Sequence, residues 1–189
     1  VAGDLSREAH ILIDAFWPGP LTLIFPKQDI IPFQTTAGLK TVAVRMPSHP
    51  VAKAILELLD LPVAAPSANS SGYPSPTLAQ HVYHDLQGKI PLIIDGGPCQ
   101  VGLESTVLDI MSKKPKILRP GGITARDLEQ VLGYEVECNI NSEEDKESSL
   151  PPLAPGMKYR HYSPVTPLYL IRSELINKNE GYLKKYKDR

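Results

Sequence analysis

Residues 6–25 read SREAHILIDAFWPGPLTLIF, and this stretch contains a helix, a stop and a strand in direct succession. Asp4 or Ser6 can cap a helix that must end at Trp17-Pro18-Gly19-Pro20, because proline cannot continue a helix. The short apolar run 21–25 then predicts a strand. The residues that can share the apolar face of the helix are Ala9, Ile11, Leu12, Ala15 and Phe16.

The rest of the chain alternates in the same way between apolar runs and amphipathic segments. Helices are predicted over 50–59, over 77–83 with Thr77 as its cap, and over 124–132. Strands are predicted over 41–46, 61–65, 91–94, 105–110 and 115–118. Strands that alternate with helices indicate an α/β fold, although this pattern does not give the order of the strands.

Composition narrows the class of protein. The chain has 189 residues with 42% hydrophobic and 22% charged residues, which argues against wholesale disorder. Its 19 prolines, about twice the usual share, predict many fixed loops. The net charge of −1 argues against a dedicated nucleic-acid binder, although a local basic patch stays possible.

The cysteines and the apolar stretches indicate in which cellular compartment the protein is expected. Cys99 and Cys138 lack the spacing of a zinc site or a disulfide framework, so we expect two free thiols. The first residues do not form a signal peptide, and proline and aspartate interrupt the apolar stretch 11–26, which is too short for a membrane span. We therefore expect a soluble, cytoplasmic protein with no membrane partner.

Serine and asparagine are concentrated in the loop 66–77, which follows a predicted strand and precedes a predicted helix. Hydroxyls and free backbone N–H groups in such a loop can cradle an anion or a nucleotide, although an ordinary capped loop has the same composition.

Two arginines follow predicted strands. Arg45 shares one strand face with Thr41, about 13 Å away at ~3.3 Å per residue, and Arg119 precedes a Gly-Gly turn. Ser105 lies in a Glu-Ser-Thr triplet at the start of another strand. Two strand-end arginines with nearby hydroxyls describe a site for an anionic ligand. Each feature alone also fits an exposed arginine or hydrogen bonding at a strand edge.

The stretch 154–164 mixes aromatic and basic residues and fits either a flap over a nucleotide or RNA, or a structured interdomain linker. The sequence contains no P-loop, dinucleotide glycine motif, zinc signature or Ser-His-Asp order. The scattered histidines His10, His49, His81 and His84 are expected to be solvated rather than catalytic.

Taken in order, several motifs resemble the YrdC-like threonylcarbamoyl-AMP synthases. They are FWPGPLT at 16–22, VRMP at 44–47, APSANSSG at 65–72, PSPT at 74–77, ESTV at 104–107 and LRPG at 118–121. The run 155–164 resembles the interdomain linker of the long, two-domain members. The resemblance implies a twisted mixed sheet with flanking helices around a concave cavity. It divides the chain into a partial catalytic domain at 1–137, a linker at 138–164 and the start of a second domain at 165–189.

The resemblance also implies a reaction. Family members are nucleotidyltransferases that convert L-threonine, bicarbonate and ATP to threonylcarbamoyl-adenylate and pyrophosphate, with Mg²⁺ on the phosphates. The product feeds the t6A modification of tRNA through a downstream transferase. Positioning and charge stabilisation can supply the catalysis, so no protein nucleophile is required.

Matching positions imply roles for individual residues. Arg45, Ala65 and Ser105 are implied to contact threonine, Ala65 through its backbone. ATP contacts are implied for Thr41, Ser67, Ser75 and Arg119. The linker residues implied to close over the cavity are Tyr159, His161 and Tyr162.

The sequence departs from the family pattern at both ends. The Pro-Thr-Glu-Thr-Val-Tyr-Gly-Leu-type and Lys-Arg-Pro-type segments of the family are absent, and only the start of the second domain is present. We therefore expect the 189 residues to be a fragment that alone is inactive or poorly folded. Two alternatives are a double-stranded RNA-binding module without catalysis and a carbamoyl transferase of another pathway. The net charge of −1 and the lack of stacking aromatics in the motifs weigh against the RNA module.

Overall fold

The structure is a computed structural model that describes residues 1–138. The predicted linker beyond Cys138 and the predicted second domain at 165–189 lie outside the described residues. The helices are α1 (Arg7–Phe16), α2 (Pro50–Leu59), α3 (Ala79–Leu86) and α4 (Ala125–Leu132). The strands are β1 (Leu21–Pro26), β2 (Thr41–Val44), β3 (Thr106–Asp109), β4 (Lys116–Arg119) and β5 (Glu137–Cys138).

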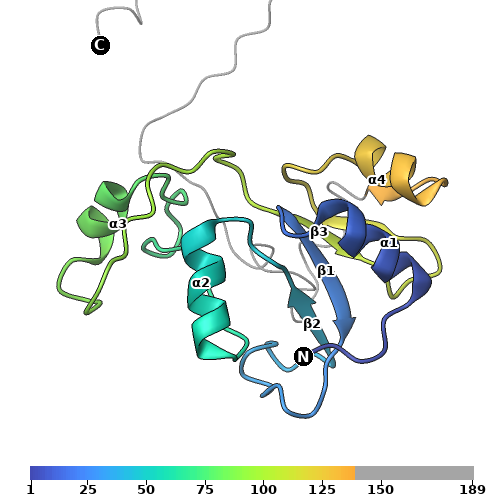
Figure 1. The fold of residues 1–189 in the computed structure, drawn as a ribbon, viewed down its shortest axis with the longest axis horizontal. Helices are drawn as coiled ribbons and strands as arrows, with labels where there is room; N and C mark the ends of the chain where they lie inside the picture. The colour runs from blue at the N-terminus through green and yellow to red at the C-terminus, as the bar shows by residue number, and fades with distance from the viewer. Residues whose placement is uncertain (139–189) are drawn as a thin grey trace, which may run out of the picture.

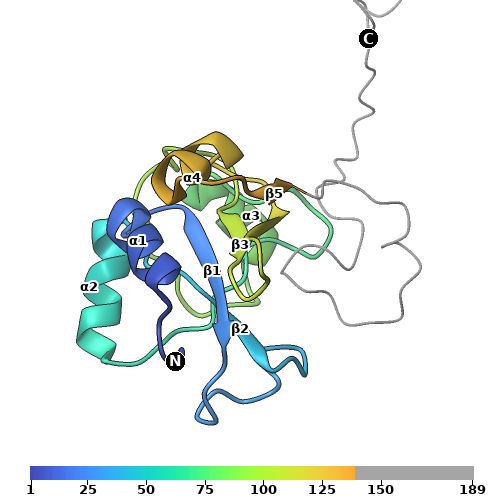
Figure 2. The ribbon, with the colours of Figure 1, turned by 90° about the vertical axis from the view of Figure 1, so that its right-hand side faces the viewer.

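The strands form one mixed sheet in the order β2-β1-β3-β4-β5. β1 is parallel to β3 and antiparallel to β2, while β4 is antiparallel to β3 and parallel to β5. Helices α1 and α4 pack together beside the sheet (Figures 1 and 2), and Figure 1 shows α2 and α3 at the other end of the molecule. The α/β class and the mixed sheet with flanking helices are thus confirmed.

The main core lies between the sheet and the pair α1 and α4. The side chains of β1 that face this side, Leu21, Leu23 and Phe25, are buried against Leu12 of α1 and Leu128 of α4. A second, smaller cluster joins Ile24, Val107 and Leu118 on the opposite face. β1, an interior strand of the sheet, is therefore buried on both faces, which explains why its sequence is apolar at nearly every position.

The predicted helix starts and stops are confirmed for α1 and α4. The Ser6 hydroxyl accepts a hydrogen bond from the backbone N–H of Ala9 at 3.2 Å and caps α1. α4 begins with a capping box in which Thr124 and Asp127 bond each other's backbone N–H, and it ends at Gly133 in the left-handed conformation.

Two predicted strands are wrong. Residues 61–65 and 91–94 form no strand, and Leu61, Val63, Leu92 and Ile94 are all exposed. No strand within residues 1–138 pairs with either segment. An apolar run without a partner has nothing to complete its hydrogen-bond ladder, and the run itself does not reveal whether a partner exists.

Smaller differences concern element ends. The predicted helix over 77–83 is α3, which begins two residues later behind Leu78, so Thr77 is not its cap. The prediction of two free thiols is confirmed, since Cys99 and Cys138 are both free and exposed. Among the helices of residues 1–138, none has the length and apolar character that crossing a membrane requires.

Candidate functional site

The ends of four strands, β1, β2, β3 and β4, lie together at one edge of the sheet. Leu21 at the start of β1 lies opposite Thr106 at the start of β3. β4 ends at Arg119, opposite Val107, and β2 ends at Val44, opposite Leu23. Because β2 and β4 are antiparallel to their neighbours, their carboxyl ends meet the amino ends of β1 and β3 at this edge.

This edge carries both strand-end arginines. Arg45 directly follows β2, and continuing the antiparallel register by one residue sets it opposite Thr22. Its side chain is exposed and makes no hydrogen bond or ion pair with other residues of the range 1–138. The register along β3 shifts at Val107, so that β4 holds one extra residue before Arg119. Such a bulge re-aims the side chains beside it.

Ser105 stands at the centre of the edge, directly before β3. Its hydroxyl lies 2.7 Å from the Thr22 hydroxyl, and both residues are buried. The Arg119 guanidinium donates to the Ser105 carbonyl from Nε at 3.1 Å and from Nη2 at 3.0 Å. Nη2 also donates to Ser105 Oγ at 3.1 Å. Arg119 therefore fixes both the backbone and the hydroxyl of Ser105.

Gly121 explains how the turn after Arg119 fits against this group. A Cβ at Gly121 would lie 2.3 Å from the Glu104 carbonyl oxygen and 2.4 Å from the Thr106 backbone nitrogen. Only glycine allows the backbone to approach the start of β3 so closely. Gly121 of the Gly-Gly turn is thus needed for packing against Ser105.

A second contact joins the serine-rich loop to the same group. The Ser75 hydroxyl donates to Glu104 Oε1 at 2.5 Å, and Glu104 directly precedes Ser105. Elsewhere in the loop the Ser70 N–H donates to the Asp85 carboxylate at 3.3 Å. The Asn69 amide donates to the carbonyls of Ser70 and Tyr73. The loop is therefore held both by its own hydrogen bonds at Asn69 and by bonds to Asp85 and Glu104 outside it.

The structure brings some of the predicted site residues together and leaves others apart. Ser105 and Arg119 are in contact, and Ser75 is joined to them through Glu104. Arg45 lies at the same edge.

Thr41, by contrast, is at the opposite end of β2, where it pairs with Pro26. Ala65 and Ser67 are exposed in the loop. The predicted linker residues Tyr159, His161 and Tyr162 lie outside the described residues.

Sequence reasoning gave no role to two members of the group, Thr22 and Glu104, although Glu104 belongs to the Glu-Ser-Thr triplet that it singled out. Thr22 is a polar residue in an otherwise apolar strand, and it retains only 9% exposure. A hydroxyl in the middle of a buried run needs a partner, which was the signal available in the sequence. Glu104 had no such signal, because an acidic residue before a strand is usually solvated.

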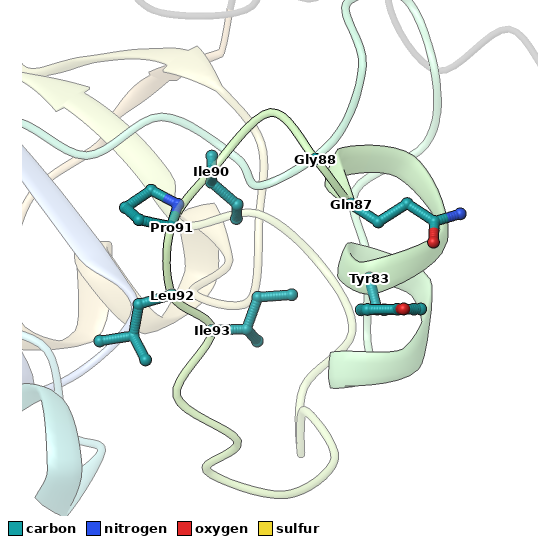
Figure 3. Close-up of a pocket in the computed structure, with 7 residues that line it drawn as sticks. All are labelled: Tyr83, Gln87, Gly88, Ile90, Pro91, Leu92 and Ile93. Carbon is teal, nitrogen blue, oxygen red and sulfur yellow. The ribbon is translucent and has the colours of Figure 1, made fainter.

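Two hollows within residues 1–138 are lined by residues other than those of this edge. The larger, of about 480 Å³, lies between α3 and residues 90–93. Figure 3 shows the side chain of Ile93 directed toward Tyr83 while Leu92 points the other way. No charged side chain lines this hollow, so it does not provide for an anionic ligand. The second, of about 300 Å³, lies beside His49 and Ile94.

The described residues offer little for a resident metal ion. Within 1–138 no three His, Cys, Asp or Glu side chains are grouped closely enough to hold one. Mg²⁺ that arrives on nucleotide phosphates needs few protein ligands, so the chemistry of the residues is compatible with Mg²⁺ as part of a nucleotide substrate.

Comparison with known proteins shows which family models the chain matches. Residues 1–121 match the Sua5/YciO/YrdC family model, whose description is "Telomere recombination". Residues 123–189 match the model described as "Threonylcarbamoyl-AMP synthase, C-terminal domain".

Curated relatives include the threonylcarbamoyl-AMP synthases of Pyrococcus abyssi and Bacillus subtilis. The first is 46% identical over 100% of this chain and 55% of its own length. The second is 50% identical over 89% of this chain and 48% of its own length. The chain therefore spans about half the length of these relatives.

Solved structures agree with the sequence matches. The crystal structure of Pyrococcus abyssi Sua5 complexed with L-threonine matches with a TM-score of 0.85 at 45% identity, over 100% of this chain and 55% of that one. Escherichia coli YciO matches with a TM-score of 0.60 at 26% identity, over 67% of this chain and 62% of that one. On these matches, the chain belongs to the Sua5/YciO/YrdC family.

Proposed function

We propose that the edge with Arg45, Ser105 and Arg119 is a substrate-binding site of a threonylcarbamoyl-AMP synthase. The enzyme would convert L-threonine, bicarbonate and ATP to threonylcarbamoyl-adenylate and pyrophosphate. Relatives named threonylcarbamoyl-AMP synthase support the enzyme class. The observation that carries the proposal is the edge itself, where Arg119 donates to the Ser105 hydroxyl and Arg45 directly follows the end of β2.

The proposed reaction needs charge control rather than a protein nucleophile. The threonine amine adds to carbon dioxide released from bicarbonate and loses a proton, which gives a carbamate. A carbamate oxygen then attacks the α-phosphorus of ATP, and the bond to pyrophosphate breaks. The threonine carboxylate, the carbamate, ATP and pyrophosphate are all anionic, so placed arginines and hydroxyl donors stabilise both the bound substrates and the charge of the transition state.

The individual assignments follow from position. Arg45, exposed and unpaired among residues 1–138, is proposed to hold the threonine carboxylate, with Ser105 beside it. Arg119 already neighbours Ser105 and is proposed to contact ATP across the same edge. Ala65 is also proposed to contact threonine. The other residues proposed to contact ATP, which would carry Mg²⁺ on its phosphates, are Thr41, Ser67 and Ser75. The residues proposed to form a lid are Tyr159, His161 and Tyr162.

The wider assignments are part of the same proposal. The adenylate product is chemically suited to a transferase that moves the threonylcarbamoyl group to tRNA. A cytoplasmic location fits that role. The division of the chain at 1–137, 138–164 and 165–189 stays a prediction.

The test joins the 189 residues to the segments that its relatives carry outside the matched region and measures pyrophosphate release. We expect release that depends on threonine, bicarbonate and ATP together, and Arg45→Ala should raise the KM for threonine. Release without threonine would favour the carbamoyl transferase instead. Absence of release combined with tight, salt-sensitive binding of double-stranded RNA would favour the RNA-binding module.

A further inference from the structure

We propose that Thr22 is a positioning residue that fixes the Ser105 hydroxyl as a hydrogen-bond donor to the amino-acid substrate. This inference rests on the proposed function and adds a residue that does not itself touch the substrate. Thr22 lies on β1 and Ser105 precedes β3, so two neighbouring strands supply the pair.

The pair is almost removed from solvent. Thr22 is 9% exposed and Ser105 is 7% exposed, and their hydroxyl oxygens are 2.7 Å apart. At this distance one hydroxyl donates to the other. The direction of that bond determines what Ser105 can offer a ligand.

A count of protons and acceptors shows what each direction requires. A serine hydroxyl has one proton and two lone pairs. Arg119 Nη2 lies 3.1 Å from Ser105 Oγ, and a guanidinium only donates, so it occupies one lone pair. Within residues 1–138 the Thr22 hydroxyl has no hydrogen-bond partner other than Ser105.

In either direction one of the two hydroxyl protons has no acceptor within residues 1–138, and such a buried proton is costly. If Thr22 donates, the leftover proton is on Ser105, where a substrate bound at the edge can accept it, so the substrate-bound state favours Thr22 as the donor. Both lone pairs of Ser105 Oγ are then occupied, one by Arg119 and one by Thr22. The single proton of Ser105 is left for an outside acceptor. A carboxylate or carbamate oxygen of the substrate is such an acceptor, whereas the substrate ammonium group is not.

Without Thr22 this preference disappears. In Thr22→Val the Ser105 hydroxyl regains a free lone pair and rotates among other partners, so it no longer presents its proton in one direction. Thr22→Ser keeps the donor and should keep the function. Because the effect passes through Ser105, the Thr22→Val substitution should matter only when Ser105 carries a hydroxyl.

The experiment measures KM for threonine, KM for ATP and kcat in the extended protein described above. We expect Thr22→Val to raise the KM for threonine about fivefold to tenfold, the factor expected for one hydrogen bond, and to leave the KM for ATP within about twofold. Thr22→Ser should return the KM for threonine to within about twofold of the parent. If Thr22→Val does not fold, Thr22→Cys keeps the volume with a weak donor and should give a KM between the two.

A double-mutant cycle separates positioning from general destabilisation. In the Ser105→Ala background, Thr22→Val should leave the KM for threonine unchanged. Thr124→Ala is the matched control, because it removes a threonine hydroxyl bond from the cap of α4 and should lower stability without changing that KM. An equal KM increase from Thr22→Val in both backgrounds, or none in either, overturns the inference while the proposed function stands. If the parent itself shows no threonine-dependent release, both fail.

Discussion

The sheet half of the molecule, residues 1–44 and 105–138, differs sharply from the outer segment, residues 45–104. Every buried residue of the range 1–138 lies in the sheet half, and none lies between 45 and 104. Leu12, Leu21 and Leu108 are 0% exposed, whereas Leu58 is 87% and Leu92 is 69% exposed. Both regions are rich in apolar residues, so the difference comes from whether a neighbouring layer covers them.

This contrast bears on the expectation that the 189 residues alone are inactive or poorly folded. The exposed apolar residues of α2 and of segments 61–65 and 91–94 form a surface that water disfavours. The chain also spans about half the length of its relatives. The expectation stays a prediction, and the outer segment is where it can be tested.

The largest expected difference is in amide hydrogen exchange. Amides of β1 and β3 are hydrogen-bonded in the centre of the sheet and should exchange only on global unfolding. Amides of 61–65 and 91–94 lack strand partners and should exchange by local opening. Mass spectrometry or NMR measures the exchange rates of both regions. Equal protection would show that the two regions do not differ in local stability.

A matched pair of leucine truncations tests the same contrast in stability. Leu108→Ala removes a fully buried side chain and should lower the free energy of unfolding by about 2–5 kcal/mol. Leu58→Ala removes a side chain that is 87% exposed and should change it by no more than about 0.5 kcal/mol. Denaturant titration measures both, and a comparable loss in the two variants would contradict the account.

A glycine substitution tests the close approach behind Ser105. Gly121→Ala sets a methyl group against the backbone of Glu104 and Thr106 and should cost about 1–3 kcal/mol of stability. Gly3→Ala is the control, because nothing lies within 4 Å of its added carbon. Equal thermal stability of the two variants would show that the turn is not packed against β3 as described.

The smallest expected effect concerns the capping box of α4. Hydrogen bonds from the Thr124 hydroxyl and backbone N–H lower the pKa of the Asp127 carboxyl below its ordinary value of 3.8. A lowered folded pKa means that the stabilisation is present above the unfolded pKa and is lost as pH falls through the folded pKa. The stability difference between parent and Asp127→Asn should shrink on acidification below 3.8, and a constant difference would count against this cap.

Local signals were enough to predict the helices of the sheet half. Ser6, the prolines after α1 and the Thr124 cap act within a few residues of the chain, so the sequence contains the whole cause. The exposed segments 61–65 and 91–94 were mispredicted because pairing depends on a partner strand elsewhere.

The site was predictable in its residue types and not in its assembly. Ser105, Arg45 and Arg119 are recognisable as strand-end polar residues. That they share one edge follows from strand order and from the register shift at Val107, neither of which the sequence reveals. Thr22 and Ser105 are 83 residues apart in the sequence, and their hydroxyls meet only because the sheet folds as it does. Only the structure therefore identifies the role of Thr22.

The most direct test of the central claim is calorimetric titration of L-threonine into the extended protein and into its Ser105→Ala variant. We expect the parent to bind threonine and Ser105→Ala to weaken binding about tenfold, because one donor to an anionic group is lost. Equal threonine affinity in the two proteins would show that the sheet edge at Ser105 is not where the amino acid binds.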